Sequence, residues 1–311
     1  MPPSITPIRI GIVGVGKIVR DQHLPALAKN PGYRLVAAAS RHEKIDGIPN
    51  YPSIEAMLED VAELEAVSLC MPPQFRFDAA RAALEAGKHV FLEKPPGATV
   101  SEVEHLKELA AERGVSLFAS WHSRYAPAVE FARTFLTSTT IRSVAINWKE
   151  DVRRWHPKQE WIWQPGGFGV FDPGINALSI ATHILPKMFI TAATLDFPEN
   201  RHAPIAAQIA FRTLDGVPVT ANFDWRQTGP QSWDILAHTA AGSMLLSGGG
   251  AKLAIDGQIV HDEPEAEYPM LYRRFAEITR TGALDADVAP LQHVADAFML
   301  GQRNVVEAFY D

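Results

Sequence analysis

The first 120 residues alternate short apolar runs with amphipathic stretches. The apolar runs lie at residues 8–13, 35–39, 66–70, 88–92 and 116–119. Between them, apolar positions recur at helical spacing up to Leu27 and over residues 54–59, 75–86 and 101–113, where Ser101 is the expected N-cap of the last helix. Strands that alternate with helices in this way predict βα units and a parallel sheet.

The second half of the chain has a different pattern. Residues 144–150 have strand character, and residues 191–260 alternate β-rich runs with turns such as Leu214-Asp215-Gly216 and Gly248-Gly249-Gly250. Helices are expected at residues 268–281 and 291–309. The predicted fold class is therefore α/β: a doubly wound parallel sheet over residues 1–124, then an α+β domain with a large, mostly antiparallel sheet over residues 125–311.

A glycine turn follows the first strand. Gly14 permits a tight turn, Gly16 lets the backbone approach a pyrophosphate, and the next helix presents its N-terminus to the phosphates. Val19 replaces the third small residue of the usual fingerprint. This pattern is typical of a dinucleotide-binding Rossmann domain, and it predicts that Gly14, Gly16, Lys17 and Ile18 contact the cofactor.

The second strand ends in Ser40-Arg41-His42, where a chain that binds NAD would carry an acidic residue for the ribose hydroxyls. A hydroxyl and a guanidinium can instead hold a 2′-phosphate, because arginine presents a fixed fork of donors to phosphate oxygens. We therefore expect these three residues to bind NADP in preference to NAD, with NAD used more weakly.

Lys94 follows the strand at residues 88–92 and precedes Pro95 and Pro96, which forbid continuation of that strand. A cation is thus held at the carboxyl edge of the predicted sheet, where ligands bind in open α/β folds. Pro72 follows the third strand and is expected at the same edge.

The region from Trp148 to Trp163 is dense in aromatic and polar side chains. Indole faces suit the C–H face of a pyranose, and Glu150, Asp151, Arg153, Arg154 and His156 offer partners for hydroxyl groups. The alternative is a packed aromatic loop that closes the domain. The tryptophans Trp148, Trp155, Trp161 and Trp163 together favour a sugar-binding wall, and we expect Glu150, Trp155 and Trp163 to contact substrate.

Asp172 and Asn176 are four residues apart in a loop that enters a helix. They share one helix face if the helix has begun by Asp172, and Pro173 suits such a start. The ordinary alternative is that Asp172 caps the helix.

Composition limits the partners of the chain. A net charge of −7 argues against nucleic acid as the main partner, and no apolar run approaches the length of a membrane span. The lone Cys70 fits a reducing compartment, and the first residues lack the basic start and apolar core of a signal peptide. We expect a cytoplasmic protein without a membrane partner. The Cys and His residues lack metal-ligand spacing, so no metal is expected.

Several segments carry a family resemblance that covers nearly the whole chain. They are Gly16 to Pro25, Ala39 to His42, Glu93 to Thr99, Trp121 to Pro127, Trp148 to Pro157 and Gly166 to Asn176. The chain resembles the glucose-fructose oxidoreductase and inositol dehydrogenase family, and within it the L-arabinose/D-galactose 1-dehydrogenase branch. The resemblance implies oxidation of C1 of an aldopyranose, a homodimer or higher homo-oligomer, and cofactor contacts by Pro72, Glu93, Lys94 and His122, with His122 also contacting the sugar.

The expected catalytic residues are Lys94, Asp172 and Asn176, all of them also in contact with substrate. Asp172 is ionised at neutral pH and can accept the C1 hydroxyl proton, while Lys94 stabilises the developing alkoxide; these two roles could be reversed. The family usually has histidine where this chain has Asn176, which can orient a hydroxyl group but cannot take its proton. Alternatives are a dehydrogenase of another sugar or an inositol, and a non-catalytic regulator that binds NADP and sugar.

Overall fold

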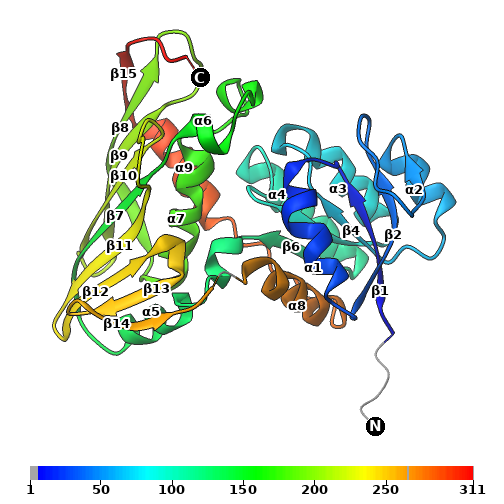
Figure 1. Cartoon of the computed structure of the whole chain (residues 1–311), viewed down its shortest axis with the longest axis horizontal. Coiled ribbons are helices and arrows are strands. Elements are labelled where there is room, and N and C mark those ends of the chain that lie inside the picture. The colour runs from blue at the N-terminus through cyan, green and yellow to red at the C-terminus, as the bar shows by residue number, and fades with distance from the viewer. Residues whose placement is uncertain (1–5, 265, 311) are drawn as a thin grey trace. The chain divides into compact units, whose positions relative to one another are not determined.

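The computed structural model describes residues 6–264 and 266–310. The chain folds into two compact units (Figure 1). The first runs to Trp121 and takes in Tyr268–Val288, and the second comprises His122–Glu267 and the chain from Ala289 onward. The sequence predicted one boundary at residue 124. The structure instead places the first boundary after Trp121 and returns a later segment to the first unit.

The first unit is built on a parallel sheet with strand order β3-β2-β1-β4-β5-β6. The strands are β1 (Ile8–Val13), β2 (Tyr33–Ala39), β3 (Asn50–Tyr51), β4 (Ala66–Leu69), β5 (His89–Glu93) and β6 (Leu117–Ser120). The short edge strand β3 was not predicted, because two residues give no periodic signal. The strand order reverses at β1, and ligands bind at the carboxyl ends of the strands at such a point.

Helices connect these strands as the sequence predicts. They are α1 (Leu24–Ala28), which continues a π-helical turn at Val19–His23, α2 (Ile54–Asp60), α3 (Arg76–Glu85) and α4 (Val100–Arg113). Thr99, not Ser101, is the N-cap of α4. Its Oγ1 accepts from the Glu102 N–H at 3.2 Å, and the Glu102 carboxylate accepts from the Thr99 N–H at 3.2 Å. This reciprocal pair is a capping box.

Helix α8 (Glu267–Thr279) supplies aromatic side chains to the first unit from Tyr268 onward. The ring centroids of Tyr272 and Phe91 lie 5.1 Å apart, and those of Phe275 and Phe118 lie 5.9 Å apart. The segment after α8 also pairs with β6, since Ala119 N–H donates to the Asp285 carbonyl at 2.9 Å. This stretch was expected in the second domain, but its buried rings complete the core of the first.

The second unit contains a large sheet with order β14-β13-β12-β11-β7-β10-β9-β8-β15. Its strands are β7 (Ile141–Lys149), β8 (Met188–Pro198), β9 (Ala206–Thr213), β10 (Pro218–Asp224), β11 (Ser232–Thr239), β12 (Gly242–Ser247), β13 (Lys252–Ile255), β14 (Gln258–Asp262) and β15 (Gln302–Val306). Neighbours are antiparallel except for β7 with β10 and β8 with β15. The predicted α/β class, with a mostly antiparallel sheet in the second half, is confirmed.

Helices α7 (Phe171–Ile184) and α9 (Ala289–Leu300) cover one face of this sheet (Figure 1). The second unit also contains α5 (Val129–Thr137) and the short α6 (Val152–Trp155). A helix was predicted over residues 291–309, but α9 ends at Leu300 and β15 follows. Gly301 lies between the two elements, where only glycine fits, because a Cβ there would lie 2.5 Å from the Ala297 carbonyl oxygen and 2.9 Å from the Leu195 side chain.

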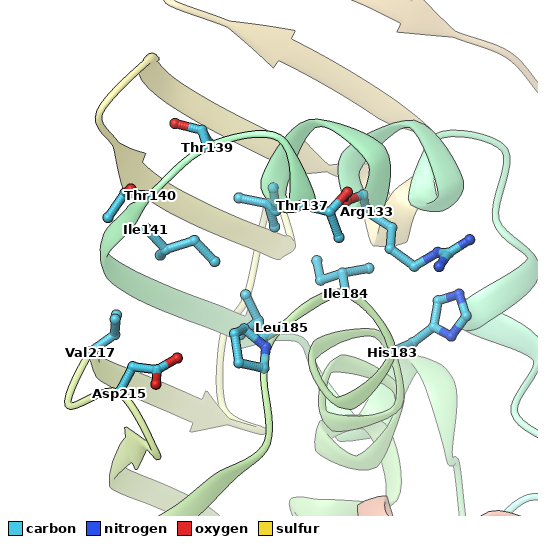
Figure 2. Close-up of a pocket in the computed structure, with 12 residues that line it drawn as sticks. Arg133, Thr137, Thr139, Thr140, Ile141, His183, Ile184, Leu185, Asp215 and Val217 are labelled. Carbon is cyan, nitrogen blue, oxygen red and sulfur yellow. The ribbon is translucent and has the colours of Figure 1, made fainter.

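A cavity of about 520 Å³ lies in the second unit beside the ends of α5 and α7 (Figure 2). Arg133 and His183, which line it, already pair with the Glu130 carboxylate. Both side chains are therefore already bound within the protein. Within the described residues, no helix is both long and apolar enough to cross a membrane.

Candidate functional site

The glycine turn after β1 combines one crowded and one open position. Gly14 has φ +84°, and a Cβ there would lie 2.7 Å from the Met71 backbone nitrogen, so only glycine fits. Gly16 is exposed, and nothing lies within 4 Å of the position that its Cβ would take. The backbone is thus open to close approach at Gly16, directly before a helix N-terminus. This geometry fits the phosphates of a dinucleotide.

The other predicted cofactor residues next to this turn lie on the surface. Lys17 pairs with Asp21, and the side chain of Ile18 is 36% exposed. Ser40, Arg41 and His42 follow β2, the parallel neighbour of β1, so they lie at the same carboxyl edge as Gly14. Ser40 is half-buried, whereas Arg41 and His42 are exposed. Arg41 is therefore available to an anionic group at this edge.

Pro72 and Lys94 lie at the carboxyl ends of the adjacent parallel strands β4 and β5. The buried guanidinium of Arg76 donates hydrogen bonds to the carbonyls of Met71, Glu93 and Pro95, which connects the two turns. Lys94 is half-buried. The structure thus brings the glycine turn, the Ser40 loop, Pro72 and Lys94 to one edge of the first unit.

Glu93 was expected to contact the cofactor, but its carboxylate is enclosed by the first unit. Only 5% of the residue is exposed. Oε1 accepts hydrogen bonds from the Tyr268 hydroxyl at 2.7 Å and from Nε2 of His23 at 3.0 Å, while Oε2 accepts from the backbone N–H of Lys94 at 2.8 Å. The carboxylate is thus bound by protein groups on both oxygens, one of which binds the backbone of Lys94.

His122 and Trp121 stand where the chain leaves the first unit. Nδ1 of His122 lies 2.5 Å from the Glu267 carboxylate within the second unit. Trp121 is 3% exposed and donates from Nε1 to the Asp287 carbonyl at 2.8 Å within the first unit. The indole of Trp121 is therefore part of the packing, not of a ligand surface.

The second unit gathers polar groups at one end of its sheet. Glu150 follows β7 and Trp225 follows the parallel strand β10, so the two residues emerge side by side. Trp233 reaches the same place from the antiparallel strand β11. The buried carboxylate of Glu150 accepts from Nε1 of Trp225 at 3.2 Å and from Nε1 of Trp233 at 3.0 Å.

Burial is the main cause of a raised pKa at Glu150. The nearby Asp172 carboxylate raises the pKa further, whereas the two indole N–H groups and His156 lower it. Asp172 and His156 therefore lie close enough to Glu150 to influence its ionisation.

Asp172 lies in the first turn of α7 and is 3% exposed. Its Oδ2 is 3.3 Å from Nε2 of His156, whose Nδ1 lies 3.3 Å from Oε1 of Gln159. Val170 is the N-cap residue of α7, so the alternative of a capping Asp172 is wrong. Asn176 follows one turn later, so the two residues share a helix face, as their four-residue spacing predicts. Asn176 is half-buried.

The pairing of His156 with Asp172 was not predicted. The sequence identified His156 only as one of several possible hydroxyl partners. A signal was present, because the chain lacks the family histidine at position 176 and has another histidine shortly before the Asp172 helix. An imidazole supplied by a loop can stand beside the same carboxylate.

The tryptophans do not form one exposed wall. Trp155 is 38% exposed and lies 5.6 Å from Trp233 between ring centroids. Trp163 is 1% exposed and packs against Trp225, with ring centroids 5.3 Å apart, and Trp148 is 4% exposed. The expectation that Trp163 contacts substrate is therefore corrected: its indole is core, and Trp155 offers the accessible face. Among the described residues, no group of three or more His, Cys, Asp or Glu could hold a metal ion.

Comparisons with known proteins agree with this architecture. The model of the oxidoreductase family with an NAD-binding Rossmann fold, Gfo/Idh/MocA, matches residues 8–120. A galactose 1-dehydrogenase of Pseudomonas fluorescens is 45% identical over 307 residues, which cover 98% of this chain and 99% of that protein. The crystal structure of a D-galactose 1-dehydrogenase from Rhizobium etli matches with a TM-score of 0.96 and 69% identity, covering 99% of each chain.

A more distant structure shares the fold alone. A 3-ketoreductase from Actinomadura kijaniata, solved with NADP, has a TM-score of 0.83 at 21% identity and covers 97% of this chain and 100% of its own. The resemblance drawn from the sequence motifs is thus confirmed by relatives that match along nearly the full length. The chain belongs to the oxidoreductase family with an NAD-binding Rossmann fold that includes glucose-fructose oxidoreductase and inositol dehydrogenase.

Proposed function

We propose that this protein oxidises C1 of an aldopyranose to the aldonolactone, with L-arabinose and D-galactose as substrates and NADP as the preferred cofactor. The observation that carries the proposal is the cluster of Asp172, His156 and Glu150, which Trp233 connects to the exposed indole of Trp155. Acidic groups with an indole face suit a ligand rich in hydroxyl groups. The two relatives described as galactose 1-dehydrogenases support the sugar class.

Each polar residue has a distinct part in the reaction. Asp172 accepts the proton of the C1 hydroxyl, and His156 stabilises the carboxylate before that transfer. Lys94 stabilises the negative charge that develops on the C1 oxygen, and Asn176 orients the hydroxyl group. The chemistry that a bound nicotinamide supplies is acceptance of the hydride that leaves C1. The products are the lactone, the reduced cofactor and one proton.

The arrangement around Asp172 favours it as the proton acceptor. Its carboxylate is buried 3.3 Å from Nε2 of His156, which holds it in place for the proton transfer. Lys94 as acceptor remains the alternative, and it would require a neutral amine. An anomeric hydroxyl is more acidic than an ordinary alcohol, which lowers the demand on either base.

Activity with a panel of sugars tests the substrate class. The purified protein is mixed with NADP and L-arabinose, D-galactose, D-glucose, D-xylose or myo-inositol, and the absorbance of the reduced nicotinamide is followed. We expect turnover with the first two. Turnover with a different member would replace the substrate and keep the chemistry. Cofactor binding without turnover of any member would favour the non-catalytic regulator.

Substitution of Asp172 tests its role. We expect Asp172→Asn to lower kcat by about 100-fold or more, the range lost with a general base, while KM for the sugar changes little. Asp224→Asn is the matched control, since that carboxylate pairs with Arg226 outside the cluster. An unchanged kcat in Asp172→Asn would remove Asp172 from the mechanism.

The proposed cofactor preference rests on Ser40 and Arg41 at the carboxyl end of β2, with the exposed guanidinium as the partner of the 2′-phosphate. We expect the double variant Ser40→Asp, Arg41→Gln to lower the ratio of kcat/KM with NADP to kcat/KM with NAD. The variant removes a hydrogen-bond donor to the 2′-phosphate and adds a carboxylate that accepts hydrogen bonds from the ribose hydroxyls. Arg34→Gln removes an exposed guanidinium from the body of β2 and serves as control. An unaltered ratio in the double variant would refute this assignment.

We also propose a cytoplasmic homodimer or higher homo-oligomer, as the family resemblance implies. Exposed apolar side chains on the sheet of the second unit, Phe189 at 47% and Leu245 at 37%, are consistent with a subunit contact there.

A further inference from the structure

A cluster of buried polar side chains adjoins the backbone of Lys94 in the first unit. We call it the Glu93 cluster; it consists of His23, Ser68, Glu93, Tyr268 and Tyr272. His23 is fully buried, and its Nδ1 lies 2.6 Å from the Tyr272 hydroxyl. Ser68 Oγ is 3.4 Å from the same nitrogen. The members come from segments far apart in the sequence: His23 and Tyr268 contact the Glu93 carboxylate, and Ser68 and Tyr272 contact His23.

Glu93 links this cluster to the backbone of Lys94. One carboxylate oxygen accepts from His23 and Tyr268, and the other accepts from the Lys94 N–H. The side chain of Glu93 is therefore fixed from the interior before it reaches the Lys94 peptide. Charge-assisted hydrogen bonds to one carboxylate oxygen fix the position of the whole carboxylate. The peptide N–H that binds the other oxygen is therefore held in place as well.

Arg76 holds the same turn through its carbonyl groups. Its guanidinium donates to the carbonyls of Glu93 and Pro95, which flank Lys94 in the chain. Arg76 is 2% exposed. The peptide units around Lys94 are thus held by a buried carboxylate at the N–H and by a buried guanidinium at the neighbouring carbonyls.

The charge state of His23 strengthens this arrangement. Burial alone would lower its pKa, but the contacts with Cys70, Tyr272 and Glu93 outweigh burial and raise the pKa of His23 well above its ordinary value. The imidazolium can donate to Glu93 and to Tyr272 from its two ring nitrogens.

Packing alone does not account for these groups. Burying a charged pair costs desolvation energy, and apolar residues of similar volume often serve stability as well or better. The neighbouring core positions of the unit do use apolar rings, including Phe91 and Phe118. The charged members are concentrated where the chain turns to present Lys94.

We propose that His23 and Tyr268 are positioning residues for the reaction, which act through Glu93 to fix the backbone of Lys94. This inference rests on the proposed function, since Lys94 is there the group that stabilises the C1 alkoxide. Loss of either donor releases the Glu93 carboxylate, loosens the Lys94 turn and misplaces the amine. Misplacement of a catalytic group by about 1 Å can cost about 100-fold in rate.

Tyr268→Phe tests the inference because it removes one hydroxyl and keeps the ring. The matched control is Tyr33→Phe, which also removes a buried hydroxyl, since the Tyr33 hydroxyl donates to the Tyr272 carbonyl at 2.8 Å and makes no hydrogen bond to Glu93. We expect Tyr268→Phe to lower kcat about tenfold or more, with KM for sugar and the Kd of NADP changed less than about twofold. Tyr33→Phe should keep the wild-type kcat.

Two further measurements separate positioning from stability. His23→Gln retains an N–H donor for Glu93 and should keep most of kcat, whereas His23→Leu should lose as much as Tyr268→Phe. Hydrogen exchange of the segment 91–99 should become faster in Tyr268→Phe and His23→Leu, but not in Tyr33→Phe. Equal kcat values and equal exchange in Tyr268→Phe and Tyr33→Phe would overturn the inference.

Hydrogen exchange also keeps the two proposals apart. If the wild-type protein turned over no sugar, the proposed function would fail while exchange at segment 91–99 would still decide whether the cluster fixes Lys94. If the wild-type protein were active and the Tyr268→Phe variant matched the Tyr33→Phe control, only the positioning role would fail.

Discussion

Glu150 is a carboxylate enclosed by indole rings, and its environment gives stability a definite pH dependence. Its pKa is raised, chiefly by burial, so the folded state favours the protonated form more than the unfolded state does. For a group with a raised folded pKa, the stability contribution is fully present below the unfolded pKa and is lost as pH rises through the folded pKa.

The variant Glu150→Gln tests this pH dependence of stability, because the glutamine side chain does not titrate. We expect the free energy of unfolding of the wild type, minus that of the variant, to decrease as pH rises from about 4 through the raised pKa of Glu150. Urea denaturation at a series of pH values gives the difference. A difference that stays constant across this range would contradict the burial argument. In kinetic assays, the Glu150→Gln variant should have a higher KM for the sugar than the wild type, because it binds the sugar less tightly.

At single residues, the sequence predicted which side chains share a helix face better than it predicted which side chains are exposed. Asp172 and Asn176 were predicted to share a helix face, and the structure has them one turn apart. Residue type alone could not show that Trp163 is buried or that Glu93 turns inward, because both depend on packing partners distant in the sequence, such as Trp225 and Tyr268.

Among the elements, those with a clear period were predictable and those without one were not. Strand β1 occupies the predicted residues 8–13, and α4 begins within one residue of the expected start. The N-cap at Thr99 was missed, although Glu102 three residues later completes the Ser/Thr-x-x-Glu pattern of a capping box. Strand β15 was predicted as helix because its local sequence does not reveal the partner strand β8.

At the scale of the whole molecule, the return of the chain to the first unit could not be read from the sequence. An amphipathic helix at residues 267–279 shows an apolar face but not which core that face joins. The structure assigns it through Tyr272 and Phe275, both fully buried, which pack against Phe91 and Phe118. The first unit is therefore discontinuous in sequence.

This assignment predicts that residues 1–121 alone do not form a stable unit. Burying one such aromatic side chain contributes about 1.5–3 kcal/mol, so loss of α8 removes a large part of a typical domain stability. We expect no cooperative thermal unfolding of the 1–121 fragment, monitored by circular dichroism. A chain that joins residues 1–121 to 268–288 through a flexible linker should recover it. Cooperative unfolding of the short fragment would disprove the prediction.

The discontinuous first unit also has a consequence for synthesis on the ribosome. Translation delivers Phe91 and Phe118 long before Tyr272 and Phe275, and the whole stretch His122–Glu267 must be made in between. At ordinary elongation rates this interval lasts on the order of ten seconds. During that time the nascent sheet presents an uncovered aromatic surface, the kind of surface that molecular chaperones bind and that drives aggregation of incomplete chains.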